Sequence, residues 1–260
     1  EKHELTSGST WHAAASYHTY NSDANVSRLQ KYTIDLYREI ERISGQSCGI
    51  HDTGGIVVAA NETVLDNLHV MHSRGRYLGL EMEIISPTEA QKLNPLLDPK
   101  HFIAALWRRD GGHVDNNGVT QAYAISARKA GAEVYRFTHV TGLRQRRDGT
   151  WDVITDKGNI HAEHVVNAGG LWAREVGRMV GIDLPVLAME HMYIVTEEIP
   201  EIVAHGKEVL PTTDYSGEIY MRQEGRGMLM GTYEQACKVW SPHTTPWDFN
   251  MQLLPDDVDR

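Results

Sequence analysis

Helical and strand-like segments alternate along this chain of 260 residues, and this alternation is the feature that most restricts its fold. Residues 27–43 carry apolar side chains at helical spacing, and Gly45 ends the pattern. Residues 56–60 form a short β-branched run behind Gly54 and Gly55, which predicts a buried strand. A mixed order of this kind predicts an α/β protein in which helices cover a sheet.

Capping signals predict where further helices begin. Asn61 can cap a helix over residues 62–73, and the sequence from Ser86 to Glu89 is a capping box with proline at the first helical position. The next predicted elements are a strand over 104–107, a helix over 119–130 that is capped by Asp115 or Asn116 and closed by Gly131, and a strand over 133–137.

Glycine-bearing turns predict antiparallel strands in the second half of the chain. Turns at Asp148-Gly149 and Lys157-Gly158 separate three short runs, over residues 140–146, 151–155 and 160–161, which predicts a β-meander. Residues 189–196 alternate as a strand, and residues 218–224 and 228–233 form a hairpin. Tyr220 and Arg222 share one face of that hairpin, where Arg222 suits an ion pair better than a ligand contact.

Two segments have the pattern of a backbone that approaches a bound anion or a cofactor. An apolar run over residues 165–168 predicts a strand, which leads into Gly169 and Gly170 and then into a helix over 172–180. Residues 5–16 read LTSGSTWHAAAS, which predicts a tight turn that feeds a helix start, where backbone N–H groups favour an anion. Alone, each pattern is also typical of ordinary close packing or of a capped helix with a half-buried His12.

Composition excludes several classes of function. The net charge of -10 argues against a nucleic-acid partner, and no apolar run approaches the length that spans a membrane. The two cysteines, Cys48 and Cys237, suit a reducing compartment and form no disulfide framework. The 14 histidines show no recognisable metal-ligand spacing, so no metal site is predicted. A G-x-G-x-x-G phosphate loop is not found either, which indicates a fragment of a longer protein.

Several motifs in order resemble one known family. They are EKHELTSGSTWHAA at the start, DGTWDV at 148–153, VVNAGGLWAREVGRM at 165–179, YMRQE at 220–224 and TPWDF at 245–249. Together they resemble the dimethylglycine and sarcosine dehydrogenase family over nearly the whole chain. The resemblance implies an FAD-binding dinucleotide fold of the D-amino-acid-oxidase type with an inserted mixed-sheet substrate domain, incomplete at both ends. It assigns residues 1–19 and 111–185 to the FAD domain, and residues 20–110 and 186–260 to the substrate domain.

The resemblance also implies which residues meet the cofactor. His12 would carry FAD covalently, through a ring nitrogen joined to the 8α-methyl carbon of the flavin, and Glu1 would accept hydrogen bonds from the ribose hydroxyls. Departing from the family pattern, Ala15 stands where the family usually has glycine. The full set of implied cofactor-binding residues is Glu1, Lys2, Gly8, Ser9, Thr10, Trp11, His12, Ala13, Ala14, Ala15, Ser16, Val140, Gly169, Gly170 and Trp172.

The activity that the resemblance implies is oxidative N-demethylation of a small N-methylated amino acid, dimethylglycine first and sarcosine second. His191 and Tyr220 match the residues that line the substrate side. Electrons would pass to an electron-transfer flavoprotein or to oxygen, and tetrahydrofolate would bind in a C-terminal domain beyond these residues. The expected location is the bacterial cytoplasm or the mitochondrial matrix. Two alternatives remain: a regulatory relative such as a pyruvate dehydrogenase phosphatase regulatory subunit, and another methylamine-type flavin oxidase.

Overall fold

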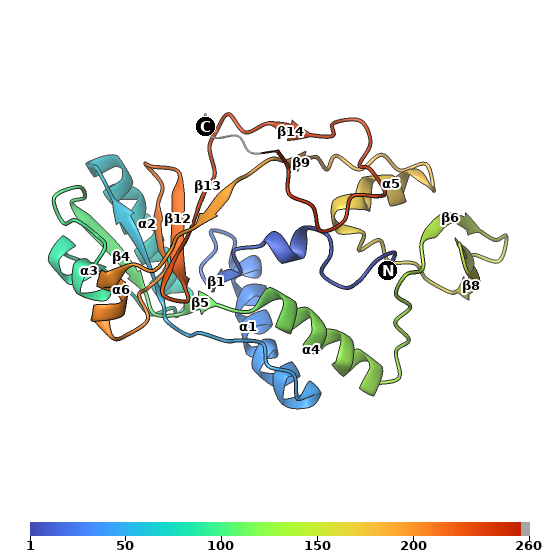
Figure 1. Ribbon diagram of the computed structural model, residues 1–260, viewed down its shortest axis with the longest axis horizontal. Helices are drawn as coiled ribbons and strands as arrows, with labels where there is room; N and C mark the ends of the chain where they lie inside the picture. Colours follow the sequence, from blue (N-terminus) through green and yellow to red (C-terminus); the bar gives the residue numbers. More distant parts are fainter. Residues whose placement is uncertain (256–260) are drawn as a thin grey trace. The chain divides into compact units, whose positions relative to one another are not determined.

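The computed structural model describes residues 1–255 of a mixed α/β fold, which confirms the predicted fold class (Figure 1). The chain divides into two compact units. Unit 1 contains Glu1–Ala13, Tyr123–Glu190 and Lys238–Arg260, and unit 2 contains Ala14–Ala122 and His191–Cys237. The functional division into an FAD domain and a substrate domain stays a prediction, and the last five residues of its range 186–260 lie outside the described part.

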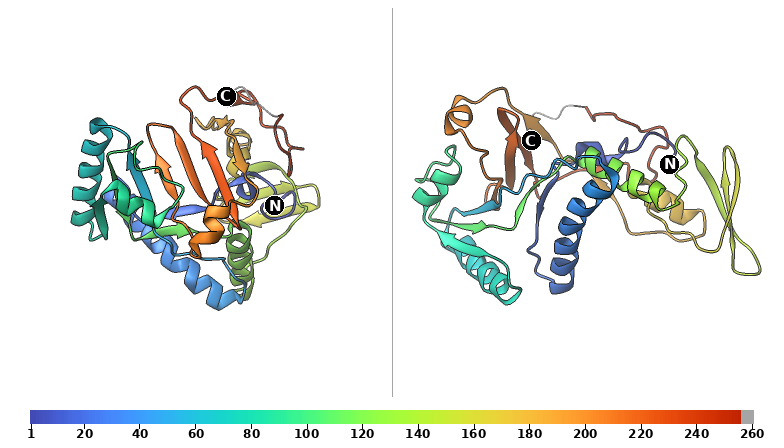
Figure 2. Two further views of the ribbon diagram at one scale, coloured as in Figure 1. Left: turned by 60° about the vertical axis from the view of Figure 1, so that its left-hand side comes forward. Right: turned by 90° about the horizontal axis from the view of Figure 1, so that it is seen from below.

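A seven-stranded mixed sheet is the centre of unit 2 (Figure 1 and Figure 2). Its strands lie in the order β10 (Tyr193–Val195), β13 (Gly227–Thr232), β12 (Ile219–Glu224), β11 (Thr212–Asp214), β2 (Gly55–Ala59), β4 (Ala104–Arg108) and β3 (Met82–Ile85). Only the pairing of β11 with β2 is parallel among these described strands, with Thr212 opposite Ile56. The predicted strands 56–60 and 104–107 and the predicted hairpin are confirmed.

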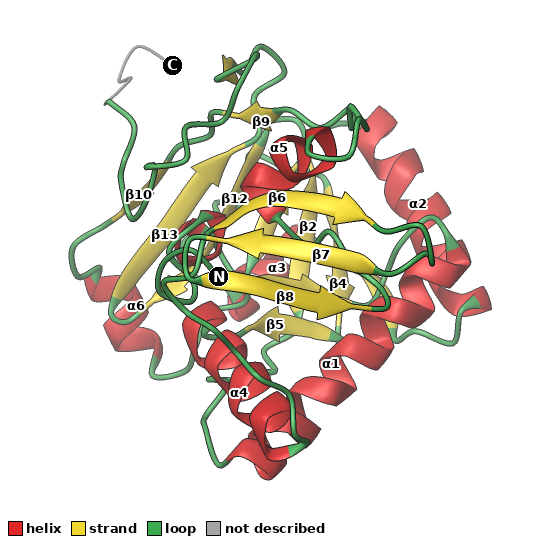
Figure 3. Ribbon diagram, turned by 90° about the vertical axis from the view of Figure 1, so that its right-hand side faces the viewer, coloured by secondary structure: helices red, strands yellow, loops and turns green. Residues whose placement is uncertain are grey.

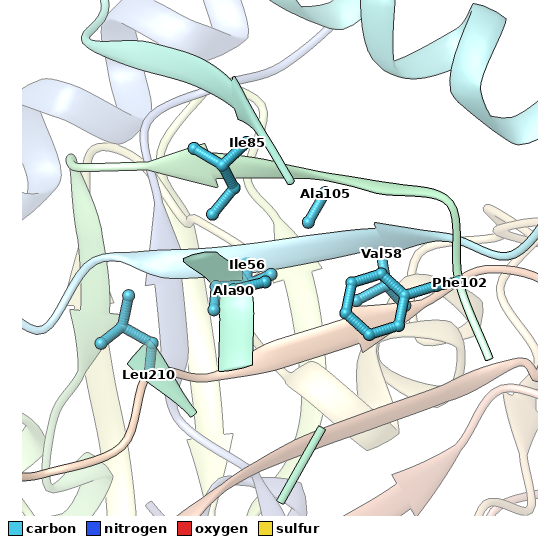
Figure 4. Close-up of a cluster of buried hydrophobic side chains, with 7 residues drawn as sticks. All are labelled: Ile56, Val58, Ile85, Ala90, Phe102, Ala105 and Leu210. Atoms are coloured by element: carbon cyan, nitrogen blue, oxygen red, sulfur yellow. The ribbon is translucent and has the colours of Figure 1, made fainter. Parts of the chain in front are cut away.

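Strand β2 is buried on both faces, because its side chains alternate between two helices. Ile56 and Val58 belong to the cluster drawn in Figure 4, where Ala90 comes from helix α3 (Pro87–Leu93). Val57 and Ala59 pack on the other face with Leu68 of helix α2 (Glu62–Tyr77). Full burial of each such large aliphatic side chain stabilises the fold by roughly 1.5–3 kcal/mol.

The predicted capping residues begin these helices. The Asn61 side chain accepts a hydrogen bond from the Val64 N–H and starts α2. Ser86 and Glu89 form the reciprocal capping box of α3, with Pro87 in its first turn. Among residues 1–255, no helix is both long enough and apolar enough to cross a membrane.

A second core in unit 2 joins helix α1 (Ala24–Ser44) to the start of helix α4 (Asn116–Lys129). Ile40, Cys48, Val119 and Ala122 are its buried members. Asp23 caps α1, and Gly45 ends it in the left-handed conformation at φ 76°. Strand β1 (Ser16–His18) pairs with β5 (Gly111–His113), and helix α6 (Pro200–His205) buries Ile202 against Val209 and Met228.

Unit 1 contains the predicted β-meander, which faces the viewer in Figure 3. Its strands are β6 (Val140–Gln145), β7 (Trp151–Thr155) and β8 (Gly158–Ala162), all antiparallel. The remaining elements are the 3-10 helices η1 (Ser9–His12) and η2 (Gly170–Trp172), helix α5 (Ala173–Arg178), and the short pair of β9 (Ala188–Met189) with β14 (Val239–Trp240).

Several predicted elements are wrong or shorter than expected. Residues 133–137 and 165–168 form no strand. Near the first of these segments, the Tyr135 oxygen accepts a hydrogen bond from the Glu1 amino group, and the Thr138 N–H donates one to the Glu1 oxygen. Two such bonds are too few for the ladder that defines a strand pair. Helix 172–180 is replaced by η2 followed by α5, and the strand 189–196 is interrupted between β9 and β10. Apolar runs alone do not supply the neighbouring strand that a ladder requires.

Candidate functional site

The segment that contains His12 is a single 3-10 turn and not the start of a helix. Element η1 covers Ser9–His12, and Ala13 already has extended dihedral angles (φ -67°, ψ 136°). The expectation that the alanine run continues a helix is therefore wrong. Ala15 has a left-handed φ of 60°, which an α-helix does not accommodate, and the chain enters β1 at Ser16.

His12 is half-buried and held in place within unit 1. Its Nε2 lies 3.2 Å from the backbone oxygen of Gln252, and its ring lies 3.9 Å from the Trp11 ring, measured between centroids. Burial lowers the pKa of His12 below its ordinary value, although the hydrogen bond with Gln252 acts in the other direction. Burial therefore favours the neutral form of the ring. Because a carbonyl oxygen only accepts, Nε2 carries the proton and Nδ1 keeps its lone pair.

Three other predicted cofactor residues meet one another in unit 1. The Lys2 ammonium lies over the Trp172 ring, 3.7 Å from its centroid, and donates a hydrogen bond to the Trp247 backbone oxygen. A Cβ at Gly8 would lie 3.1 Å from Cζ3 of Trp172, so glycine allows this close approach. The indole of Trp172 is fixed in turn by its hydrogen bond to the Pro246 oxygen, at 2.9 Å.

The paired glycines form the turn that leads through η2 into α5, although the predicted strand before them is absent. Gly170 has φ 52°, and a Cβ added to it would meet no described atom within 4 Å; the Gly169 oxygen accepts the Trp172 N–H at 2.9 Å. Asn167 braces this turn by accepting the Gly169 N–H and donating to the Ala173 oxygen. Val140 lies separately, at the start of β6 opposite Thr155. Glu1 is exposed and accepts a hydrogen bond from the His3 N–H.

The last part of the His12 segment belongs to unit 2, where buried Arg222 anchors it. Arg222 Nε donates to the Ala14 oxygen at 2.6 Å, and the Ala15 oxygen accepts the Val114 N–H at 3.1 Å. Arg222 also forms an ion pair with Glu224 at 2.6 Å, the kind of contact that its place in the hairpin predicts. Arg222 therefore holds the backbone that follows His12.

Replacing Ala15 by glycine should stabilise the protein. Ala15 has φ 60°, where a Cβ costs about 1–2 kcal/mol, and glycine removes that strain at some cost in unfolded-chain entropy. We expect Ala15→Gly to raise the free energy of unfolding by about 1 kcal/mol, measured by denaturant titration. Ala13→Gly is the matched control, since Ala13 has φ -67° and should lose stability. A loss of stability in both variants would contradict this prediction.

The two residues that were predicted to line the substrate, His191 and Tyr220, come together around Tyr233 in unit 2. The His191 ring lies 4.8 Å from the Tyr233 ring, and the Tyr220 ring lies 5.4 Å from it, both between centroids. Burial raises the pKa of Tyr220, so its hydroxyl stays protonated at neutral pH. His191 lies between β9 and β10 and Tyr220 lies in β12, so the structure groups two residues that are 29 positions apart in the sequence.

Sequence reasoning missed three members of this group. Tyr233 stands between the two predicted residues, and Glu234 Oε2 lies 3.6 Å from His191 Nδ1. Gly231 lies under the Tyr220 ring, and a Cβ at this position would come within 2.3 Å of the Tyr220 oxygen. The observed register of the hairpin places Tyr220 opposite Gly231, one residue away from the pairing that the predicted turn over 225–227 implies.

The chain matches the family model DAO, FAD dependent oxidoreductase, over residues 1–256. It therefore belongs to this family of FAD-dependent oxidoreductases.

Individual relatives align with this chain over almost its whole length. The chain is 39% identical to mitochondrial dimethylglycine dehydrogenase of Mus musculus, over 100% of this chain and 30% of that protein. It is 32% identical to mitochondrial sarcosine dehydrogenase of Mus musculus, over 99% of this chain and 28% of that protein. The chain thus spans less than a third of the length of these relatives. Among solved structures, L-proline dehydrogenase from P. horikoshii superimposes with a TM-score of 0.80 and 25% identity, over 96% of this chain and 66% of that one.

Proposed function

We propose that this chain is the flavin- and substrate-binding part of an enzyme that oxidises a small N-methylated amino acid, with dimethylglycine first and sarcosine second. The observation that carries this proposal is the neutral, fixed imidazole of His12 in a chain 39% identical to a dimethylglycine dehydrogenase. The proposal rests on that resemblance for the substrate and on the His12 geometry for covalent attachment.

The residues around His12 fit a flavin. Nδ1 of the neutral ring offers a lone pair, and covalent attachment requires an imidazole in this nucleophilic form. Trp11 Nε1 is buried beside it and has no hydrogen-bond partner among the described residues, so an acceptor-rich ligand would satisfy it. We propose that His12 is the attachment residue, with Glu1 toward the ribose and Val140 toward the adenine.

Within the proposed reaction, FAD supplies an acceptor for the hydride that leaves the N-methyl carbon. The residues of this chain prepare the amine for that step. An amine releases hydride only as its free base, whose nitrogen lone pair stabilises the resulting iminium. His191, beside the Glu234 carboxylate, is the group that takes the proton from the bound ammonium form. Tyr220, with its hydroxyl protonated, orients the substrate by hydrogen bonding.

Anaerobic titration tests this function. We expect dimethylglycine to bleach the flavin absorbance of the purified protein, with sarcosine acting more slowly and glycine, which has no N-methyl group, leaving the spectrum unchanged. His191→Asn should shift the pH dependence of the bleaching rate toward higher pH, because the substrate must then arrive as its free base. A flavin that no N-methylated amino acid reduces would overturn the proposal and favour a regulatory role.

Electron transfer and location follow from the same proposal. The reduced enzyme would pass its electrons to an electron-transfer flavoprotein or to oxygen, and tetrahydrofolate would act only through a domain outside this chain. The two dehydrogenases that the chain resembles are named as mitochondrial proteins, which favours the mitochondrial matrix over the bacterial cytoplasm for this protein as well.

A further inference from the structure

Two histidines and a glutamate that have no role in the proposed reaction meet in unit 2. His51 lies between α1 and β2, His113 ends β5, and Glu208 lies between α6 and β11. His51 Nδ1 is 2.8 Å from Glu208 Oε2, and His113 Nε2 is 2.5 Å from Glu208 Oε1. One carboxylate therefore contacts two imidazole nitrogens that come from distant parts of the chain.

The backbone fixes the two imidazoles beside each other. His51 and His113 exchange both of their backbone hydrogen bonds, at 2.9 Å and 3.1 Å, as an isolated antiparallel bridge. Their rings stack with centroids 4.4 Å apart and planes 11° from parallel. Neighbouring Val209 is buried and donates its N–H to Gln223 Oε1 at 2.9 Å, which fixes the chain next to Glu208. Such prior positioning lowers the entropic cost of gathering ligands around an ion.

The three side chains form the donor set of a divalent transition metal. One ligand atom from each lies within 4.8 Å of the other two. Imidazole nitrogen and carboxylate oxygen bind Zn²⁺ at about 2.0–2.2 Å, so neighbouring ligand atoms around a tetrahedral ion lie about 3.3 Å apart. The 2.5 Å and 2.8 Å contacts would have to open by less than about 1 Å for an ion to replace the two shared protons.

We propose that His51, His113 and Glu208 form a site for a zinc-class divalent cation. Two neutral nitrogens and one anionic oxygen match the ligands that Zn²⁺ takes in sites with one open position. The His51 side chain is 49% exposed, which leaves a path for the ion and room for a water ligand. Nearby Arg222 forms an ion pair with Glu224, so its positive charge is balanced. The ion would cross-link three segments of unit 2 and stabilise them.

Metal binding to the purified protein tests this inference, after treatment with a chelator and dialysis against Zn²⁺. We expect one tightly bound zinc per chain, and Co²⁺ in its place should give the intense visible absorption of a four-coordinate imidazole site. Glu208→Gln and His51→Asn should each weaken zinc binding by at least about 10–100-fold. His69→Asn, on the exposed face of α2, removes a histidine elsewhere and should bind zinc as the wild type does.

Stability measurements separate an ion site from a simple hydrogen-bonded contact. Zinc should raise the melting temperature of the wild type and of His69→Asn, and should leave that of His51→Asn unchanged. Because the His51 side chain is half-exposed, we expect His51→Asn to fold even if Glu208→Gln does not. Absence of stoichiometric zinc on the wild type, or equal zinc affinity in His51→Asn and His69→Asn, would overturn the proposal.

Discussion

Protein with alanine in place of His12 should carry no flavin fluorescence after acid denaturation and gel electrophoresis, whereas the wild-type band should fluoresce. Alanine has no nitrogen to form the covalent link, so the loss should be complete rather than partial. The His12 side chain is half-buried at the end of a four-residue turn, and its Nε2 contacts the Gln252 backbone oxygen. Truncation removes this one exposed hydrogen bond and should therefore leave the fold intact.

Two controls make that result specific. His3→Asn changes a histidine in the same segment and should keep the fluorescent band. Circular dichroism should show the same secondary structure in the wild type and in His12→Ala. A fluorescent His12→Ala band would mean that another residue is the attachment site. Dark bands in all three proteins would mean that flavin binds without a covalent link, or that the protein has kept the fold in a regulatory role.

Gly112→Ala should destabilise the protein far more than an ordinary glycine substitution. Gly112 has φ 154°, and an added Cβ would lie 1.8 Å from the His51 backbone oxygen. Because that atom is backbone, the strand must move, which breaks the bridge of His51 with His113 and strains the pairing of β1 with β5. We expect a loss on the order of 3–5 kcal/mol in the free energy of unfolding.

Gly79→Ala is the matched control for Gly112→Ala. Gly79 also has a positive φ, 73°, but no described atom lies within 4 Å of its added Cβ. It should lose only about 1–2 kcal/mol, from the left-handed conformation alone. Denaturant titration of both variants measures the difference, which isolates the steric clash. Equal losses would show that β5 shifts freely and that the contact with His51 carries little stability.

Local signals in the sequence were enough to predict most helices and turns. Asn61, the capping box at Ser86 and the Gly149 turn act within a few residues, and the structure contains each of them. Strands at 133–137 and 165–168 were predicted wrongly, because strand formation depends on a partner that the run itself does not specify. The alanine run after His12 has high helix propensity, but the left-handed Ala15 ends any helix there.

The candidate site was predictable only in part. His12, His191 and Tyr220 were found by resemblance. Their neighbours Tyr233 and Glu234 could be found only from the register of the hairpin and the path of the chain after it. His51 and Glu208 are 157 residues apart, and no spacing rule links positions so distant. Such a group becomes visible only when the tertiary structure brings its members together.

The parallel pairing of β2 with β11 sets the order in which unit 2 is completed during synthesis. Thr212 aligns with Ile56, so the most buried strand of the sheet waits for a partner until more than 150 further residues have left the ribosome. Until then, one edge of an apolar strand stays open to intermolecular pairing. A nascent chain that pauses before residue 212 therefore exposes that edge to aggregation.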